Sequence, residues 1–268
     1  MKHAIQFCCS CALLLFVAGK AAASERHFAF TYETSVLAEG DAELEPWTTV
    51  RVGRERYYSR IDNRLEFELG LFPNLQTALY WNFSRTTEDI EDPISGELSR
   101  VSTTSFNSIS SEWKYNLSNP VADALGSALY LEGTYGPALV EVEGKLLLDK
   151  QLGDVLIALN LVAEKEWELV RPDTIEKLIF EADLGLGYFF TPSFVGGVEV
   201  VSETFVESDE VTSSALYAGP SIAYADSHYW LSFAVTPQVF APKSQSGDTT
   251  DLARGEAVRG RVLLGFHL

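Results

Sequence analysis

Apolar and polar residues alternate with a period of two in one segment of this chain after another. In 60–69, for example, Ile61, Leu65 and Phe67 fall on one parity, and charged residues such as Glu66 fall on the other. Such alternation indicates a β-strand with one apolar and one polar face. The pattern predicts twelve strands, with the ranges 43–54, 59–69, 75–84, 101–116, 127–136, 138–149, 155–164, 179–190, 194–203, 213–225, 229–240 and 256–268.

The links between these strands alternate in length. The tight links are 71–74, 150–154, 191–193 and 225–228. The longer, polar links are 85–100, 165–177, 204–211 and 241–253. Strands of about ten residues tilted near 45° span a bilayer, and short inner turns, long outer loops and an even strand count are typical of membrane barrels. The fold class predicted is therefore all-β, a transmembrane antiparallel up-and-down β-barrel of about twelve strands.

The first residues of the chain form a separate segment. Lys2 precedes the apolar run 12–18, and small residues follow up to Ala23 and Ser24. This order is typical of a cleaved secretory signal, and the run is too short to span a bilayer as a helix. We expect a signal peptide at 1–24, cleaved near Ala23 or Ser24.

Cysteine usage and charge narrow the class of protein. The three cysteines, Cys8, Cys9 and Cys11, all lie in the expected signal, so the exported chain would hold no disulfide and no Cys-ligated metal. The formal net charge of −18 excludes nucleic acid as a partner, because binding phosphates requires Lys and Arg to replace counterions. With 46% apolar and 12% aromatic residues, the chain is too apolar to be a disordered acidic one.

Aromatic residues gather near both ends of the predicted strands, as they do where a barrel meets the membrane interfaces. Trp113 lies near an inner end and Trp81 near an outer end. The alternative, a soluble β-sandwich with an aromatic core, gives no reason for a charged face on so many strands.

Pro46, Pro220 and Pro237 fall inside predicted strands, where each removes a ladder hydrogen bond unless a bulge or a strand end accommodates it.

The last predicted strand, 256–268, has a pattern that is found in a known class of proteins. Val258, Val262 and Phe266 share its apolar parity, while Arg259 and Arg261 share the other. A strand of this kind at the end of an exported chain resembles the final strand of Gram-negative outer-membrane β-barrels.

Residues 27–37 also alternate, but a thirteenth strand would break the even count. Residues 25–42 are therefore expected to form a periplasmic or lumenal N-terminal segment ahead of a barrel at 43–268.

Two further stretches, 43–49 (ELEPWTT) and 65–71 (LEFELGL), resemble the opening of an uncharacterised, porin-like family of outer-membrane barrels. The resemblance covers roughly 33–83. It implies the fold, a location in the cell outer membrane, contact with outer-membrane lipid, and assembly machinery that engages the C-terminal strand. It carries over no functional residue.

The polar parity of the strands is rich in charge, and these side chains are expected to line the lumen. Acids outnumber bases among them. The predicted lumen residues are Glu43, Glu45, Arg51, Asp62, Arg64, Glu66, Glu68, Glu112, Lys114, Glu132, Glu141, Glu143, Lys145, Glu164, Glu181, Asp183, Glu199, Arg259 and Arg261.

Pairings between these residues follow from the expected hairpins. A turn near Arg56 would bring Arg51 opposite Asp62, and Glu45 opposite Glu68. Closure of the barrel would join its first and last strands. The pairing expected at that seam brings Arg261 and His267 toward Glu43 and Glu45.

Two interpretations of the charged lumen stand side by side. In one, the charges pair with each other and stiffen a mostly occluded barrel. In the other, surplus carboxylates concentrate cations in a water-filled pore. We predict an outer-membrane channel for passive passage of small, preferentially cationic or neutral hydrophilic solutes; the alternative is a non-conducting structural or surface-interaction barrel.

Catalytic chemistry is not indicated. The histidines of the exported chain, His27, His228 and His267, all map to the inner side, whereas barrel hydrolases act near the outer leaflet or rim. The sequence contains no phosphate loop, zinc-ligand spacing or hydrolase elbow. We expect no enzyme activity, no cofactor and no metal.

Overall fold

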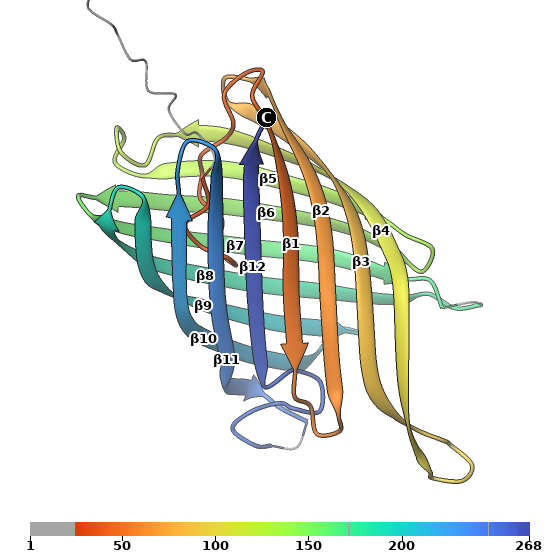
Figure 1. Ribbon diagram of the computed structural model, residues 1–268. Coiled ribbons are helices and arrows are strands. Elements are labelled where there is room, and N and C mark those ends of the chain that lie inside the picture. The colour runs from red at the N-terminus through yellow and green to blue at the C-terminus, as the bar shows by residue number, and fades with distance from the viewer. Residues whose placement is uncertain (1–24, 171, 246) are drawn as a thin grey trace, which may run out of the picture.

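The structure is a computed structural model, and it describes residues 25–170, 172–245 and 247–268. Twelve antiparallel strands form one closed barrel in which each strand pairs with its neighbours in sequence and β1 pairs with β12 (Figure 1). The strands are β1 (Ala42–Val52), β2 (Tyr58–Phe72), β3 (Leu75–Glu91), β4 (Leu98–Ser118), β5 (Gly126–Tyr135), β6 (Leu139–Leu152), β7 (Val155–Glu168), β8 (Ile175–Thr191), β9 (Phe194–Glu207), β10 (Glu210–Ala225), β11 (Tyr229–Lys243) and β12 (Val258–His267). The predicted fold class and strand number are confirmed, and the expected signal peptide at 1–24 lies outside the described residues.

The two ends of the barrel differ. We call the upper end in Figure 1, which carries the C-terminus and the links 73–74, 119–125, 153–154, 192–193 and 226–228, the turn end. We call the opposite end the loop end; its links are 53–57, 92–97, 136–138, 169–174, 208–209 and 244–257. In the part of the chain that the structure describes, no helix is long and apolar enough to cross a membrane.

Strands at the loop end are longer than the sequence pattern predicted. The expected loop 85–100 is mostly strand and shrinks to 92–97, and the expected loop 204–211 shrinks to Ser208 and Asp209. Both of these residues have positive φ, 52° and 65°, as a two-residue hairpin turn requires. The prediction was wrong because polar strand extensions beyond a bilayer need no apolar parity, and apolar parity is what the pattern detects.

The outward parity presents a continuous apolar surface. Strand β5 shows the rule, since its side chains alternate strictly between buried and exposed or half-exposed from Gly126 to Tyr135. The large exposed apolar side chains include Phe67, Leu79, Trp81, Trp113, Leu131, Leu161, Leu186, Val198, Phe233 and Phe266. A soluble protein does not expose apolar surface on this scale, whereas a bilayer requires it.

The three prolines inside strands occupy interruptions of the ladder. The β1–β12 pairing skips from Leu44 to Trp47, so Pro46 lies in a gap on that side. Pro220 and Pro237 share one gap, because the β10–β11 pairing has no partners between Tyr217 and Ser221. Each proline still pairs on its other side. Local gaps in single ladders thus accommodate the missing N–H donors.

The register of the first hairpin differs from the prediction by two residues. Thr49 pairs with Asp62, and Arg51 pairs with Arg60, so the expected pairings of Arg51 with Asp62 and of Glu45 with Glu68 were wrong. The chain reverses through 53–57, where Gly53 has a φ of 84°, one position earlier than assumed. A shift of two residues keeps every side chain on its face, and Arg51 Nε still lies 3.6 Å from Asp62 Oδ2.

The lipid-facing assignment leads to a test. Leu131 lies in the middle of β5 and is 54% exposed. We expect Leu131→Arg to cost about 2–4 kcal/mol of folding free energy, the range for Arg at a bilayer midplane. The measurement is equilibrium urea unfolding in lipid vesicles. Leu125→Arg, in the turn-end link 119–125, is the matched control with an expected cost of about 0–1 kcal/mol, and equal costs at the two positions would contradict the assignment.

Candidate functional site

Residues 25–37 lie inside the barrel rather than in its wall, and the exposed residues 38–41 lead from them into β1. Figure 1 shows this segment entering the lumen from the turn end, before β1. Phe28, Ala29, Thr31 and Thr34 are completely buried, although none of them belongs to a strand. We call residues 25–41 the lumenal segment.

Wall side chains hold the backbone of the lumenal segment in place of a strand ladder. The Glu199 carboxylate on β9 accepts hydrogen bonds from the backbone N–H groups of Ala29, Phe30 and Thr31, at 2.8, 2.7 and 2.8 Å. On β7, the Asn160 amide accepts the Tyr32 N–H through its oxygen and donates to the Tyr32 carbonyl through its nitrogen. Buried backbone groups need such partners.

Further along, Asp149 on β6 accepts hydrogen bonds from the N–H and the hydroxyl of Thr34. Gln76 on β3 accepts the N–H of Leu37, and Asn116 on β4 donates to the Thr34 carbonyl. Of the wall anchors, only Glu199 was among the predicted lumen residues. The others are polar side chains on the inward parity of their strands, and that is the one sequence signal that could have found them.

An aromatic cluster packs against the lumenal segment. It comprises Phe30 and Tyr32 of the segment itself and Trp47, Tyr130 and Trp230 of the wall, and the same buried cluster extends to Tyr217. The guanidinium of Arg26 stacks 3.8 Å from the Tyr32 ring centroid and 5.0 Å from that of Trp47, geometry in which a desolvated cation is stabilised by the ring. The lumenal segment and this cluster fill the turn half of the barrel.

The histidines expected at the inner side lie at the turn end. His27 Nδ1 is 2.9 Å from a carboxylate oxygen of Glu33. Burial acts to lower the pKa of the His27 imidazole, but the hydrogen bond and charge of Glu33 outweigh burial and raise it above its ordinary value. At the seam, His267 Nδ1 lies 2.9 Å from Glu43, as expected. Arg261 does not reach an acid there.

The Arg261 expectation was wrong because of register. Arg261 pairs with Thr49, well along β1 from Glu43 and Glu45. Its guanidinium donates to the Thr49 hydroxyl at 2.9 Å and to the Ala29 carbonyl at 3.4 Å. It therefore joins the seam to the lumenal segment.

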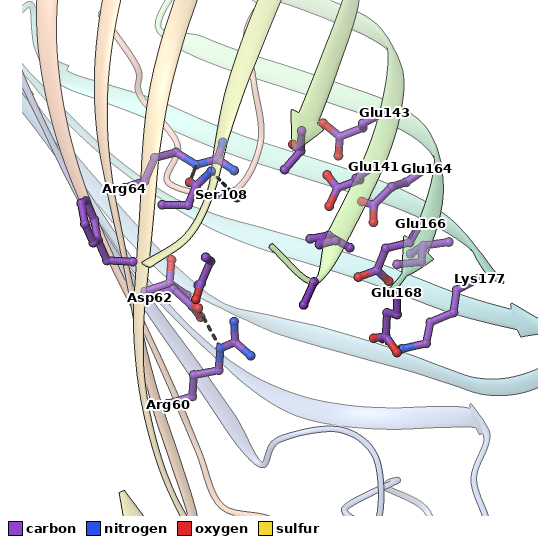
Figure 2. Close-up of a pocket in the computed structure, with 18 of the residues that line it drawn as sticks. Arg60, Asp62, Arg64, Ser108, Glu141, Glu143, Glu164, Glu166, Glu168 and Lys177 are labelled. Carbon is purple, nitrogen blue, oxygen red and sulfur yellow. Dashed lines mark hydrogen bonds and ion pairs between the residues drawn. The ribbon is translucent and has the colours of Figure 1, made fainter. Parts of the chain in front are cut away.

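The loop half of the lumen contains a cavity of about 850 Å³, which we call the vestibule. Most of its basic residues come from one sector of the wall, β12–β1–β2: Arg51, Arg60, Arg64 and Arg261. The exception is Lys177 on β8, whose Nζ lies 2.5 Å from a carboxylate oxygen of Glu168. Its acids come mainly from the opposite sector, β6–β9: Glu141, Glu143, Glu164, Glu166, Glu168, Glu181 and Glu203. Figure 2 shows Arg60 and Arg64 on one side and the carboxylates of β6 and β7 on the other. A second cavity of about 190 Å³ continues inward to Phe30 and Lys145.

Some of these charges are paired and others are not. Lys145 Nζ lies 3.0 Å from Glu143, Arg259 Nη2 lies 2.6 Å from Glu203, and Arg64 Nη2 lies 3.5 Å from Glu132. Within the described residues, by contrast, Glu141 and Glu164 form no hydrogen bond or ion pair. The acidic sector of the described chain therefore presents carboxyl groups without a basic partner to the cavity.

The predicted lumen residues are all buried or half-buried, and the structure sorts them into two groups. The vestibule and its inward continuation are lined by Arg51, Asp62, Arg64, Glu132, Glu141, Glu143, Lys145, Glu164, Glu181, Arg259 and Arg261. The remainder lie buried below or beside the vestibule: Glu43, Glu45, Glu66, Glu68, Glu112, Lys114, Asp183 and Glu199.

Strand register connects the two groups through a single row of carboxylates. Neighbours across successive strands are Glu43 on β1, Glu68 on β2, Ala78 on β3, Glu112 on β4, Glu132 on β5, Glu143 on β6 and Glu164 on β7. Glu43 is at the turn end of β1, while Glu164 lines the vestibule near the loop end of β7. The row therefore runs obliquely along the lumen, from the turn end at Glu43 to the vestibule at Glu164. Sequence parity found its members, but only the register shows that they are consecutive.

Comparison with known proteins agrees with this architecture. Residues 20–268 match the model of a family of unknown function, DUF6662, and no curated protein sequence matches the chain. A structure described as the COG4313 outer membrane channel from Pseudomonas putida F1 is similar, with a TM-score of 0.58, 11% identity, and coverage of 88% of this chain and 98% of that one. The NanC porin is also similar, with a TM-score of 0.53, 10% identity, and coverage of 84% and 100%.

The similarity extends beyond channels. The β domain of the Bordetella autotransporter BrkA aligns with a TM-score of 0.50, 11% identity, and coverage of 86% and 100%. At these identities the shared property is the fold, that of outer-membrane β-barrels. Together with the apolar outer surface, the fold places this chain in the outer membrane.

The anchoring of the lumenal segment is testable by hydrogen exchange. Glu199→Ala would leave three buried N–H groups without a partner, at about 1–3 kcal/mol for each. Because about 1.4 kcal/mol corresponds to tenfold, we expect exchange at residues 29–31 to accelerate tenfold or more while the strands stay protected. Glu97→Ala, in the exposed link 92–97, is the control. Unchanged exchange at 29–31 would show that the Glu199 bonds do not hold the segment.

Proposed function

We propose that this chain, which belongs to the DUF6662 family, forms a narrow outer-membrane channel for small cationic or neutral hydrophilic solutes. The observation that supports this most is the row of carboxylates from Glu164 at the vestibule to Glu43 at the turn end. Rings or rows of acidic side chains in a low-dielectric pore concentrate cations. The carboxyl groups of Glu141 and Glu164, which have no basic partner in the part of the chain that the structure describes, line the vestibule where a solute would enter.

The vestibule suits small solutes that carry charge or hydrogen-bonding groups. Arginines on β12–β1–β2 and acids on β6–β9 face each other across about 850 Å³. A solute inside meets opposite charge on two sides, so its dipole is oriented during passage. Acids outnumber bases in the lining, which favours cations over anions.

In this proposal the lumenal segment is the gate. It occupies the turn half of the lumen, where the carboxylate row continues toward Glu43. Side chains of Glu199, Asn160 and Asp149 hold its inner part, and its backbone hydrogen bonds to a strand join Gly40 and Asp41 to Gly70 of β2, at its outer end. The inner part can therefore move without breaking the sheet.

The proposal includes no catalytic activity. His27, His228 and His267 lie at the turn end, away from the vestibule, and each has an acidic neighbour that accounts for its position. Small solutes and outer-membrane lipid are then the partners, with assembly machinery recognising β12.

The second candidate is a non-conducting structural barrel, and one observation favours it. The lumenal segment and the aromatic cluster of Phe30, Tyr32, Trp47, Tyr130 and Trp230 pack the turn half with buried side chains. If that packing never opens, the vestibule is a closed-ended binding pocket. Conductance separates the two candidates.

The first prediction concerns ion selectivity. In planar bilayers under a KCl gradient, the folded protein should show current with a reversal potential that favours K⁺. The double variant Glu141→Gln, Glu164→Gln removes the two unpaired vestibule charges, so the K⁺ to Cl⁻ permeability ratio should fall several-fold. Glu97→Gln, at the exposed link 92–97, should leave the ratio unchanged. A wild-type reversal potential that favours Cl⁻ would refute the acidic filter.

The second prediction concerns the gate. Glu199→Ala weakens the hold on residues 29–31, so the open probability should rise relative to wild type at the same voltage. Single-channel recording measures it, again with Glu97→Ala as the control. An absence of current from both wild type and Glu199→Ala, with folding shown by heat-modifiable gel migration, would favour the non-conducting barrel.

A further inference from the structure

A second acidic group lies below the vestibule, in the interior of the barrel. Glu66 and Glu68 on β2 and Glu112 on β4 bring carboxylate oxygens within 4.8 Å of one another. Their exposures are only 1%, 5% and 1%. Glu43, Glu45 and Glu68 form an overlapping group of the same compactness.

Three oxygens of this group lack hydrogen-bond partners in the described part of the chain. Among the described residues, neither carboxylate oxygen of Glu112 nor Oε2 of Glu66 receives a hydrogen bond. Buried carboxylates without partners are costly, since desolvation is not repaid by any contact. A group of three in contact adds mutual repulsion to that cost. Something beyond the described side chains is required to stabilise the group if it is charged.

Nearby cations supply only part of the compensation. Lys114 is two positions from Glu112 on the same face of β4 and is buried. Arg26 acts on Glu45 and Glu66 through its charge but forms no ion pair with them among the described residues: its Nη2 donates to the Ala29 carbonyl at 3.5 Å, its plane stacks on Tyr32, and its Nε and Nη1 bond to no acceptor.

The register places a small side chain between two of these acids. Ala78 on β3 is the residue between Glu68 and Glu112 in the carboxylate row, so a methyl group stands where its row neighbours carry longer side chains. The Glu68 and Glu112 carboxylates meet across it. No His or Cys belongs to the group, and an all-carboxylate ligand set suits a hard cation.

We propose that Glu66, Glu68 and Glu112 bind one divalent cation of the Ca²⁺ class, with Glu45 next to them as a further ligand. Ca²⁺ takes oxygens at about 2.3–2.6 Å, so two oxygens on opposite sides of it lie about 4.6–5.2 Å apart. Oxygens within 4.8 Å of one another can reach one such ion, and the flexible coordination of Ca²⁺ suits a group of side-chain carboxylates better than the strict, largely hydrated octahedron of Mg²⁺. The ion ties β2 to β4 across β3 and neutralises the centre of the carboxylate row. The site stands whether or not the barrel conducts.

Terbium luminescence tests the site directly. Tb³⁺ substitutes for Ca²⁺ and emits when a nearby aromatic ring is excited, and Tyr80 is the cross-strand neighbour of Glu66. The protein is the folded barrel in detergent, stripped of metal with a chelator. We expect saturable emission that Ca²⁺ displaces, and at least tenfold weaker Tb³⁺ binding in Glu112→Gln and Glu68→Gln. Glu141→Gln, a vestibule acid outside the group, should bind as wild type does.

A second variant distinguishes loss of the binding site from misfolding of the barrel. Ala78→Leu leaves every carboxylate in place but fills the space between Glu68 and Glu112, so it should weaken Tb³⁺ binding to a similar degree. Heat-modifiable gel migration confirms the folded state of each variant before titration.

The proposal fails if folded wild type shows no saturable Tb³⁺ binding, or if Glu112→Gln binds as tightly as wild type. It also fails if Glu141→Gln alone abolishes binding, which would place the ion in the vestibule. If Glu112→Gln raises thermal stability equally with and without Ca²⁺, protons rather than a metal neutralise the group and the proposal is overturned.

Discussion

Closure of the sheet directs every second side chain of twelve strands into a shared interior, and the rest of the structure depends on that constraint. Lipid outside allows only apolar residues on one parity, so all polar function is placed on the other. The interior must then satisfy each polar group it contains. The lumenal segment does much of this, because its backbone N–H groups are the partners of Glu199, Asn160 and Asp149. The wall and the segment are thus complementary halves of one hydrogen-bond network.

Charge is distributed along the lumen in a way that distinguishes its two halves. In the turn half, aromatic rings cover Arg26, and acids lie buried around Glu68. In the loop half, Arg51, Arg64 and Arg261 face the acids of β6–β9 across a cavity. Burying a charge without a partner costs several kcal/mol, whereas a wet cavity reduces that cost. The location of the cavity therefore explains why unpaired acids such as Glu164 are tolerated there.

Period-two patterning was sufficient to predict the strands, their faces and their even number, because a bilayer imposes the same alternation on every strand. It could not set the register, since hairpin register depends on where a link such as 53–57 reverses the chain. It missed the extension of β3 to Glu91, since polar strand beyond the membrane has no apolar face. It also missed the role of Asn160, because the partner is a backbone amide that no side-chain pattern reveals.

The carboxylate row is the feature that parity alone could not reveal. Repulsion between its neighbouring acids restricts which roles for the row are plausible. Like charges directly opposite each other on neighbouring strands are destabilising, yet Glu132 faces Glu143 and Glu143 faces Glu164. The chain can place a base where one is needed, as Lys145 beside Glu143 shows. A purely structural interior would alternate acids and bases along such a row and remove the repulsion. Acids on both sides of Ala78, from the vestibule to the turn end, therefore fit the proposal that cations, in transit or bound, occupy the space beside them.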